Sequence, residues 1–163
     1  MNTDTIQLIV DRQVIRETLF RHAIYFDEGN LQGLEEVWAP DCRRDDGAGR
    51  GTVIVGRDEL INRLGVALGK FNWTHHQLGD SLIEVDGDVA TAMTYVACWH
   101  ETTSGEQCWG TARYHDELRR GDDGRWWITF RRMLMTGAEG AIAEHGGTWL
   151  ERRVPAGERN DPA

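Results

Sequence analysis

The fold of this chain is most constrained by four long strand-like segments that follow one another in its second half. Short turns separate them: Asp86-Gly87 is a strong hairpin signal, Ser104-Gly105 marks a second turn, and the run Gly-Asp-Asp-Gly at 121–124 marks a third. Long consecutive strands joined by short turns must be antiparallel. The sequence therefore predicts an antiparallel meander whose strands span residues 73–85, 88–102, 107–119 and 125–135.

The first half of the chain has the spacing of helices. Apolar residues recur at helical intervals from Ile6 to Phe26, and Gly29-Asn30 ends this first helix. Asn30 is the expected N-cap of a second helix, which Pro40 ends. The apolar face of that helix is formed by Leu31, Leu34, Val37 and Trp38.

A third helix is predicted between Gly56 and Gly69, after a short extended piece at 52–55. Leu60, Ile61, Leu64 and Leu68 form its apolar face. Three helices placed before the strands can cover only one face of the sheet. The predicted fold class is α+β, with helices packed on a curved antiparallel sheet around one apolar pocket.

Length and charge narrow the classes of protein that fit. A chain of 163 residues with 40% hydrophobic and 28% charged residues fits one domain. We expect this domain at 1–136, followed by an extension at 137–163 whose end, 155–163, is disordered. No apolar run approaches ~18 residues, and the N-terminus lacks the features of a secretion signal, so the predicted location is the cytoplasm and no membrane is involved. A net charge of −9 disfavours nucleic acid as a partner.

The tryptophans and the cysteines of the chain lead to two further expectations. Five of the seven tryptophans fall in predicted strands, and those on the face without helices would form an unusual apolar patch on a monomer. We therefore predict a homodimer or homotrimer. Cys42, Cys98 and Cys108 lack metal-type spacing and are expected as small buried hydrophobes in a reducing compartment.

Asp27 and His76 are the strongest candidates for catalysis. Asp27 lies four residues after Ala23, on the apolar face of the first helix, where a carboxylate must be hydrogen-bonded or paired. It could instead cap the helix or meet solvent. Neighbouring strand residues point to opposite faces, so only one of His75 and His76 can face the helices. An inward histidine close to a buried aspartate is a candidate general base, whereas a lone strand histidine is more often structural.

The orientation of His100 depends on the turn at Asp86-Gly87. A two-residue loop pairs Val85 with Asp88 and places His100 on the face opposite to His76. A three-residue loop with a bulge at Gly87 places both histidines on one face. The sequence permits both pairings. Strand alternation predicts that one face is shared by Thr74, His76, Leu78, Asp80 and Leu82.

Other polar residues could reach a pocket. One of Arg113, Arg131 and Arg132 could bind a carboxylate or oxyanion, although edge positions explain most such arginines. Tyr25 and Tyr95 could each donate a hydrogen bond, or pack in the core. No metal site is predicted, because the one adjacent pair, His75-His76, diverges. Phosphate-binding loops, nucleophile elbows and Cys-x-x-Cys motifs are absent from the sequence.

The ordered pattern of these residues resembles the SnoaL-like branch of the nuclear-transport-factor-2-like superfamily over about residues 5–136. It comprises Tyr25-Phe26-Asp27, Leu34, 37–41, Thr74-His75-His76, 82–88 and 124–127. The site pattern is most similar to scytalone dehydratase and hexachlorocyclohexane dehydrochlorinase. The resemblance implies a cone-shaped fold and an Asp–His dyad that removes a proton and expels a leaving group without metal or organic cofactor.

The resemblance places Asp27 and His76 on the dyad, His100 on a second pocket histidine and Arg132 on a pocket arginine. It departs from the pattern at Phe26, which replaces a tyrosine, at Asp46, which falls near another active tyrosine, and at Arg113, which replaces an asparagine. We therefore expect the reaction type to be shared more closely than the substrate. The predicted substrate-binding set is His100, Arg113, Arg132, Tyr25, Tyr95 and Trp99.

The leading functional hypothesis is a cofactor-independent lyase, of the dehydratase type, that acts on a small apolar cyclic molecule. His76 would be the general base and Asp27 would orient it. Two alternatives stay open: an isomerase or cyclase with the same base, and a non-catalytic module that binds a small molecule. Product mass separates a lyase from an isomerase or cyclase. A bound ligand without turnover indicates the binding module.

Overall fold

A computed structural model describes residues 2–46, 53–145 and 148–149 of the chain. Three α-helices come first along the chain and are interrupted by two strands; four long strands follow. The elements are α1 (Thr3–Asp27), α2 (Leu31–Leu34), β1 (Trp38–Asp45), β2 (Ile54–Val55), α3 (Arg57–Leu68), β3 (Phe71–Asp86), β4 (Val89–Thr102), β5 (Gln107–Arg120), β6 (Trp126–Glu139), the 3-10 helix η2 (Gly140–His145) and β7 (Thr148–Trp149).

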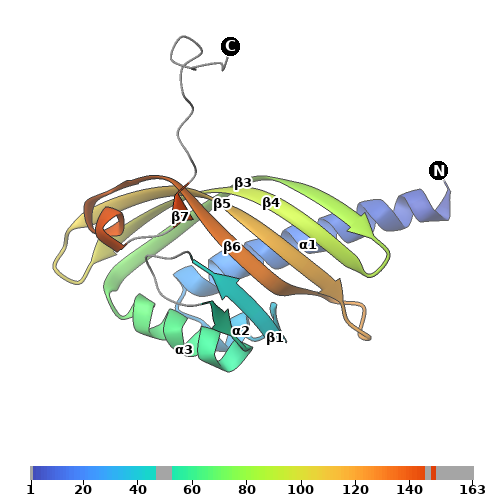
Figure 1. The fold of residues 1–163 in the computed structure, drawn as a ribbon, viewed down its shortest axis with the longest axis horizontal. Coiled ribbons are helices and arrows are strands. Elements are labelled where there is room, and N and C mark those ends of the chain that lie inside the picture. The colour runs from blue at the N-terminus through green and yellow to red at the C-terminus, as the bar shows by residue number, and fades with distance from the viewer. Residues whose placement is uncertain (1, 47–52, 146–147, 150–163) are drawn as a thin grey trace, which may run out of the picture.

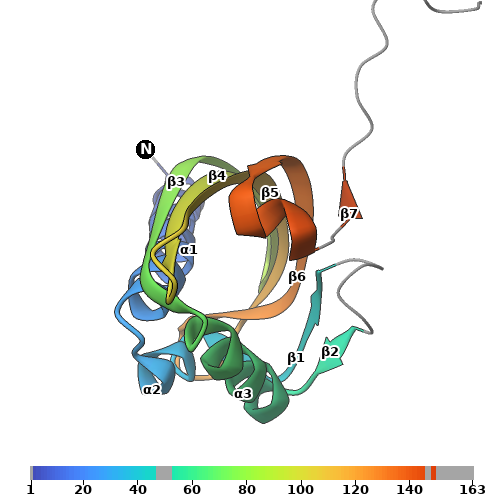
Figure 2. The same ribbon diagram turned by 90° about the vertical axis from the view of Figure 1, so that its left-hand side faces the viewer.

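The strands form one sheet in the order β2-β1-β6-β5-β4-β3, and β7 pairs with β6. Strands β3 to β6 are the predicted antiparallel meander, and β1 adds to it in parallel with β6. The long strands run side by side, with α1 along one face (Figure 1). Seen end-on, the sheet arches over α1, and α2 and α3 lie below the arch (Figure 2). The predicted α+β arrangement is confirmed.

Helix α1 begins and ends as its sequence indicates. The side chain of Asn2 caps it by accepting a hydrogen bond from the backbone N–H of Thr5 at 2.8 Å. Ile15, Leu19 and Ala23 are buried at helical spacing and join the core beneath the sheet. Asp27 is the last residue of the helix. The inner face of α1 therefore carries this carboxylate to the sheet.

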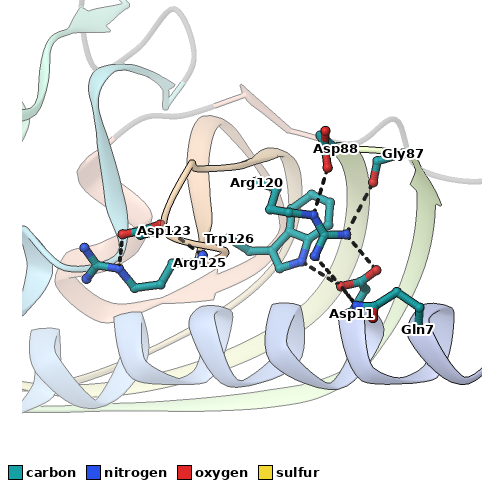
Figure 3. A network of polar contacts seen from close by, with 8 residues as sticks. All are labelled: Gln7, Asp11, Gly87, Asp88, Arg120, Asp123, Arg125 and Trp126. Atoms are coloured by element: carbon teal, nitrogen blue, oxygen red, sulfur yellow. Dashed lines mark hydrogen bonds and ion pairs between the residues drawn. The ribbon is translucent and has the colours of Figure 1, made fainter.

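A partly buried ion pair joins α1 to strand β5 (Figure 3). Both Nη atoms of Arg120 donate to the carboxylate of Asp11 at 2.7 Å, and Trp126 Nε1 donates to the same carboxylate at 3.3 Å. The Nε of Arg120 also donates to Asp88 in the β3–β4 turn at 2.9 Å. The hydrogen bonds from Arg120 outweigh burial and lower the pKa of Asp11. This network joins the N-terminal helix, two strands and a hairpin turn.

The second helix is shorter than predicted. Asn30 caps it as expected, accepting from the N–H of Gly33 at 2.8 Å, but the helix ends at Leu34. Trp38 and Pro40 instead lie in strand β1, and the N–H of Ile128 in β6 donates to the carbonyl of Val37 at 2.9 Å. Pairing with β6 therefore overrides the helical spacing. Pro40 is exposed and falls where the β1–β6 register is irregular, a position that tolerates a residue without an N–H.

A bulge in β3 determines which face His100 occupies. The turn is a two-residue loop, but it pairs Asp86 with Val89, which differs from both pairings considered above. The register then shifts between Leu78 and Ser81, so Thr74 pairs with His100. His76 and His100 consequently lie on the same inner face.

The same bulge corrects the predicted inner face of β3. Beyond it, Ile83 is 4% exposed whereas Leu82 is 65% exposed. Leu82 therefore lies on the outer face, because one extra residue reverses the alternation of side chains.

The C-terminal part of the described chain continues the same domain. Strand β6 runs to Glu139, so the predicted boundary at 136 falls inside it. Ile142 of η2 is buried against a second core cluster that includes Met133 and Met135. The predicted disorder at 155–163 lies outside the described residues. Within the part of the chain that the structure describes, no helix is long and apolar enough to cross a membrane.

Candidate active site

A cavity of about 330 Å³ lies between the helices and the inner face of the sheet. Its volume is at the lower end of the range for small-molecule sites, and most of its lining is apolar. The polar side chains on its wall belong to two histidines, two arginines, a lysine, an aspartate, a tyrosine and a cysteine. The lining comprises Phe26, Arg44, Asp46, Ile54, Arg63, Leu64, Ala67, Lys70, Phe71, His76, Val96, Cys98, His100, Gly110, Ala112, Tyr114, Met133, Met135 and Ile142.

Asp27 and His76 are in contact, as the sequence predicted, and His76 lines this cavity, whereas Asp27 is not among the lining residues. Asp27 Oδ1 lies 2.7 Å from Nδ1 of His76 and accepts the hydroxyl of Thr74 at 2.9 Å. Asp27 Oδ2 accepts the backbone N–H of His76 at 2.7 Å. Three hydrogen bonds therefore hold the carboxylate, and two of them tie it to one residue of β3.

The hydrogen bond to Asp27 determines which ring nitrogen of His76 carries the proton when the ring is neutral. Burial acts to raise the pKa of Asp27, but the hydrogen bonds from His76 and the Thr74 hydroxyl, and the attraction to the His76 ring when that ring is protonated, outweigh burial and lower this pKa. An ionised carboxylate can only accept, so Nδ1 of neutral His76 must carry the proton. Its Nε2 then keeps a lone pair, and the side chain of His76 lines the cavity.

Two rings restrict the imidazole of His76 further. Phe26 meets it edge-on with ring centroids 5.2 Å apart, and His100 lies at the same centroid distance at an interplanar angle of 52°. The side chain of His76 is only 12% exposed. His75, its neighbour, is exposed on the outer face, as predicted. The pair therefore separates into one inner and one outer histidine.

His100 belongs to the cavity, which settles the alternative left by the sequence. It is 8% exposed and its ring lies 4.6 Å from that of Phe71, centroid to centroid. Cys98, two residues earlier on β4, shares this inner face and pairs directly with His76.

Tyr114 and Arg44 are cavity residues that the sequence reasoning missed. Tyr114 is 7% exposed, and burial raises its pKa to about 12, so its hydroxyl stays protonated and can donate to a ligand. Arg44 donates to Asp46 at 2.7 Å. Burial acts to lower the pKa of Arg44, but the negative charge of Asp46 outweighs it, so this pKa is raised. Strict alternation along β5 would have identified Tyr114, because Ala112, Asp116 and Leu118 are buried with it.

His22 on α1 also lies close to the dyad and was not singled out from the sequence. It borders a small void shared with Phe26, Arg44, His76 and Tyr114. Burial lowers the pKa of His22 well below its usual value, helped by the charges of Arg131 and Arg44. Its Nδ1 accepts from Trp38 Nε1 at 3.1 Å, so His22 is a neutral structural residue.

Five predicted substrate-binding residues do not line the cavity. Tyr95 and Trp99 alternate with the inner residues of β4 and lie on the outer face, where the guanidinium of Arg113 stacks over Tyr95 at 4.9 Å. Arg132 is half exposed, and its Nε lies 3.4 Å from a carboxylate oxygen of Asp45. The two-residue period of a strand cannot place Tyr95, Trp99 and His100 on one face, which explains this correction.

Tyr25 and Arg131 have structural positions. Tyr25 packs against α2, where a Cβ on Gly33 would lie 2.7 Å from its ring. Arg131 is the inward arginine of the three considered, with 1% of its side chain exposed. Its Nε and Nη2 donate to Asp116 at 2.6 and 3.1 Å, so the buried charges are paired with each other, and neither residue lines the cavity.

The register also gathers three atoms that could bind a metal. The ligand atoms of His76, Cys98 and His100 all lie within 4.8 Å of one another. The prediction of no metal site considered only residues adjacent in sequence, whereas this cluster joins two strands.

Comparisons with known proteins identify the family of this chain and solved structures that share its fold. The SnoaL-like domain matches residues 7–132. A search of curated proteins returned no significant match. Among solved structures, a putative scytalone dehydratase from Novosphingobium aromaticivorans superposes with a TM-score of 0.77 at 19% identity, covering 96% of this chain and 99% of that one.

Two further solved structures share the fold. A hexachlorocyclohexane dehydrochlorinase, LinA type 2, gives a TM-score of 0.75 at 18% identity and covers 94% of this chain and 99% of its own. A protein of unknown function from Mycobacterium tuberculosis gives 0.71 at 26% identity, with 83% of this chain and 77% of its own covered. Similarity at these levels establishes the nuclear-transport-factor-2-like fold for the present chain.

Proposed function

Because this chain belongs to the SnoaL-like family, whose fold it shares with dehydratases and dehydrochlorinases, we propose that it is a cofactor-independent lyase. The observation that carries the proposal is the contact between Asp27 and His76 at the wall of an apolar cavity. An oriented imidazole with an unprotonated Nε2 facing a water-poor pocket is the arrangement that proton abstraction requires.

The proposed reaction is the elimination of a leaving group from a small cyclic substrate. Nε2 of His76 removes a proton from a carbon next to a carbonyl, and the electron pair forms an enolate. The enolate re-forms the carbonyl as the bond to the leaving group on the β-carbon breaks. His76, now charged and stabilised by Asp27, returns its proton to the departing hydroxide, which leaves as water. The product is an unsaturated ketone.

Neighbouring groups can stabilise the negative charge that develops on the enolate and on the leaving group. The Tyr114 hydroxyl stays protonated and can donate to an enolate oxygen. His100 lies beside His76 and could bind the leaving group or the carbonyl. The apolar walls, which include Phe26, Leu64 and Met133, favour a substrate with few polar atoms.

The proposal is tested by turnover on a panel of small cyclic β-hydroxyketones and halogenated cycloalkanes, with products identified by mass spectrometry in D2O. We expect the mass of a product that has lost water or hydrogen halide. A product that has lost no group and is heavier than the substrate only by exchange of a carbon-bound hydrogen for deuterium would favour an isomerase or cyclase with the same base. Saturable binding without turnover across the panel would contradict an enzymatic role and favour a binding module.

A further inference from the structure

We propose that His76, Cys98 and His100 form a binding site for one thiophilic divalent metal ion, of the zinc type, in the wall of the cavity. The proposal concerns binding alone and does not depend on the proposed lyase reaction. Two neutral imidazoles and one thiolate are ligands that zinc accepts readily, and they discriminate against magnesium and calcium, which prefer oxygen.

Sheet geometry brings the three side chains together. Cys98 and His100 are two residues apart on β4, so they project from the same face of the strand. His76 on β3 pairs directly with Cys98, and paired residues share a face with their side chains close together. The β3 bulge between Leu78 and Ser81 creates this register.

The distances require only small side-chain movements. All three ligand atoms lie within 4.8 Å of one another. Zinc bonds of about 2.0–2.3 Å in a tetrahedral arrangement need ligand atoms roughly 3.5 Å apart, so the side chains must rotate to bring these atoms closer together. The Cys98 thiol must also release the carbonyl of Gly110, to which it donates at 3.5 Å. His100 is buried and His76 nearly so, which limits competition from water.

Asp27 supplies a second, independent argument. Histidine ligands of metals commonly donate their other ring N–H to a carboxylate, which fixes the tautomer and raises the basicity of the ligating nitrogen. Nδ1 of His76 is hydrogen-bonded to Asp27 at 2.7 Å, so Nε2 is the atom left for the metal. Thr74 and the backbone N–H of His76 hold that carboxylate in place.

Charge and access also fit a metal ion. The thiolate of Cys98 and the carboxylate of Asp27 together balance a divalent cation. Three protein ligands leave a fourth position, which would face the cavity and could hold water or a small ligand, as in open zinc sites. Because the same Nε2 is the proposed proton acceptor, a bound metal and proton abstraction by His76 exclude each other.

The test is titration of the full-length protein with Co(II), followed by displacement with Zn(II). We expect about one Co(II) per chain and a thiolate-to-cobalt charge-transfer absorption in the near ultraviolet, which Zn(II) removes. Cys98→Ala should abolish this absorption. His100→Gln should weaken binding at least about 100-fold, and Asp27→Asn by about 10–100-fold, as expected for the partner of a ligand.

Matched variants make the result specific to these residues. Cys108→Ala and His75→Gln remove a thiol and an imidazole outside the cluster, and both should keep the absorption. Circular dichroism verifies folding, and Cys98→Ser supplies a polar variant of similar size. Lack of stoichiometric binding by the wild type, or an unchanged absorption in folded Cys98→Ala, would overturn the proposal. Because the readout is absorption rather than turnover, the titration tests metal binding whether or not the metal-free protein has lyase activity.

Discussion

Individual residues of the candidate site depend on their neighbours for their proposed roles. The carboxylate of Asp27 accepts hydrogen bonds from three donors, whereas an asparagine at this position would offer only one oxygen. The amide nitrogen would then turn toward a donor or toward Nδ1 of His76, and the tautomer with a free Nε2 would be lost. Orientation and charge at His76 therefore both depend on one side chain of α1.

Substitution of the dyad residues should separate chemistry from folding. His76→Ala should lower kcat by at least about 10³-fold because the general base is removed, and Asp27→Asn by about 10²–10⁴-fold because the tautomer is altered. His75→Ala, on the outer face, is the matched control and should keep near wild-type kcat. Steady-state kinetics on an accepted panel substrate measures the effect. Equal losses in the two histidine variants would refute the assignment.

Tyr114 should act on the developing charge rather than on binding. Tyr114→Phe removes one hydrogen-bond donor at the cavity wall and should lower kcat about 10²-fold, as loss of an oxyanion donor does elsewhere. Tyr95→Phe removes a phenol from the outer face and should change neither kcat nor KM. A kcat unaffected by Tyr114→Phe, with KM alone raised, would show that the hydroxyl does not contact the reacting oxygen.

At the scale of elements, the network around Arg120 illustrates how burial determines the value of an ion pair. Asp11 and Asp88 both bond to this arginine, but their side chains are 6% and 78% exposed. Asp11→Asn should lower the free energy of unfolding by about 1–3 kcal/mol, because it weakens hydrogen bonds from a partly buried cation. Asp88→Asn, at a solvent-exposed pair, should cost less than about 0.5 kcal/mol. Chemical denaturation of both variants tests this difference.

The pH dependence of unfolding provides a second test of the ion pair between Asp11 and Arg120. The pKa of Asp11 is lowered in the folded state, so its carboxylate contributes stability that is present above its unfolded pKa of about 3.9 and is lost as the pH falls through the folded value. Asp11→Asn should therefore lose less stability than the wild type on acidification below pH about 4. Identical acid sensitivity of the two proteins would mean that the ion pair contributes nothing.

The elements that the sequence predicted correctly depend on local signals. Turn residues marked the hairpins, and Gly56 and Gly69 bounded α3 as expected. The Asp27–His76 contact followed because helical and strand periodicity each identified an inner face. Trp38 was wrongly placed in a helix, since its strand exists only through pairing with β6, which lies far along the chain. Apart from Gly79, no residue in the sequence marks the bulge in β3. The face that His100 occupies depends on this bulge.

Pocket residues were harder to predict than the dyad. Arg113 and Arg132 were chosen by residue type and by the family resemblance. Alternation along β5 and β6 places Tyr114 and Arg131 inward instead. Arg44 reaches the cavity from β1, a strand that the sequence did not predict. Side chains that meet from strands distant in sequence become identifiable only when the order and register of the sheet are known.

At the scale of the whole molecule, the outer face of the sheet carries an exposed apolar surface. Trp99 and Trp109 pair directly across β4 and β5, Trp99 also pairs with His75, and Trp73 lies two residues before that histidine. Trp73 and Trp109 are 67% and 55% exposed. So many aromatic side chains on one face would be unusual for a monomer. We expect this face to be buried between copies of the chain.

Light scattering at micromolar concentration should therefore give the mass of a dimer or trimer. Trp109→Glu should shift the mass toward that of the monomer, because it places a charge in the proposed interface. Val66→Glu on α3, which changes a residue that is 65% exposed away from the sheet face, is the matched control and should leave the mass unchanged. A monomer mass for the wild type would contradict the expected assembly.

The central claim is that Asp27 holds His76 with a protonated Nδ1 and an unprotonated Nε2 at the cavity wall. Long-range ¹H–¹⁵N correlation of the histidine rings in metal-free protein, at pH about 8 where a histidine is ordinarily neutral, tests it directly. We predict that the His76 ring is in the Nδ1–H tautomer and that Asp27→Asn abolishes this preference. A ring in the Nε2–H tautomer in the wild type, or a preference unchanged in Asp27→Asn, would contradict the claim.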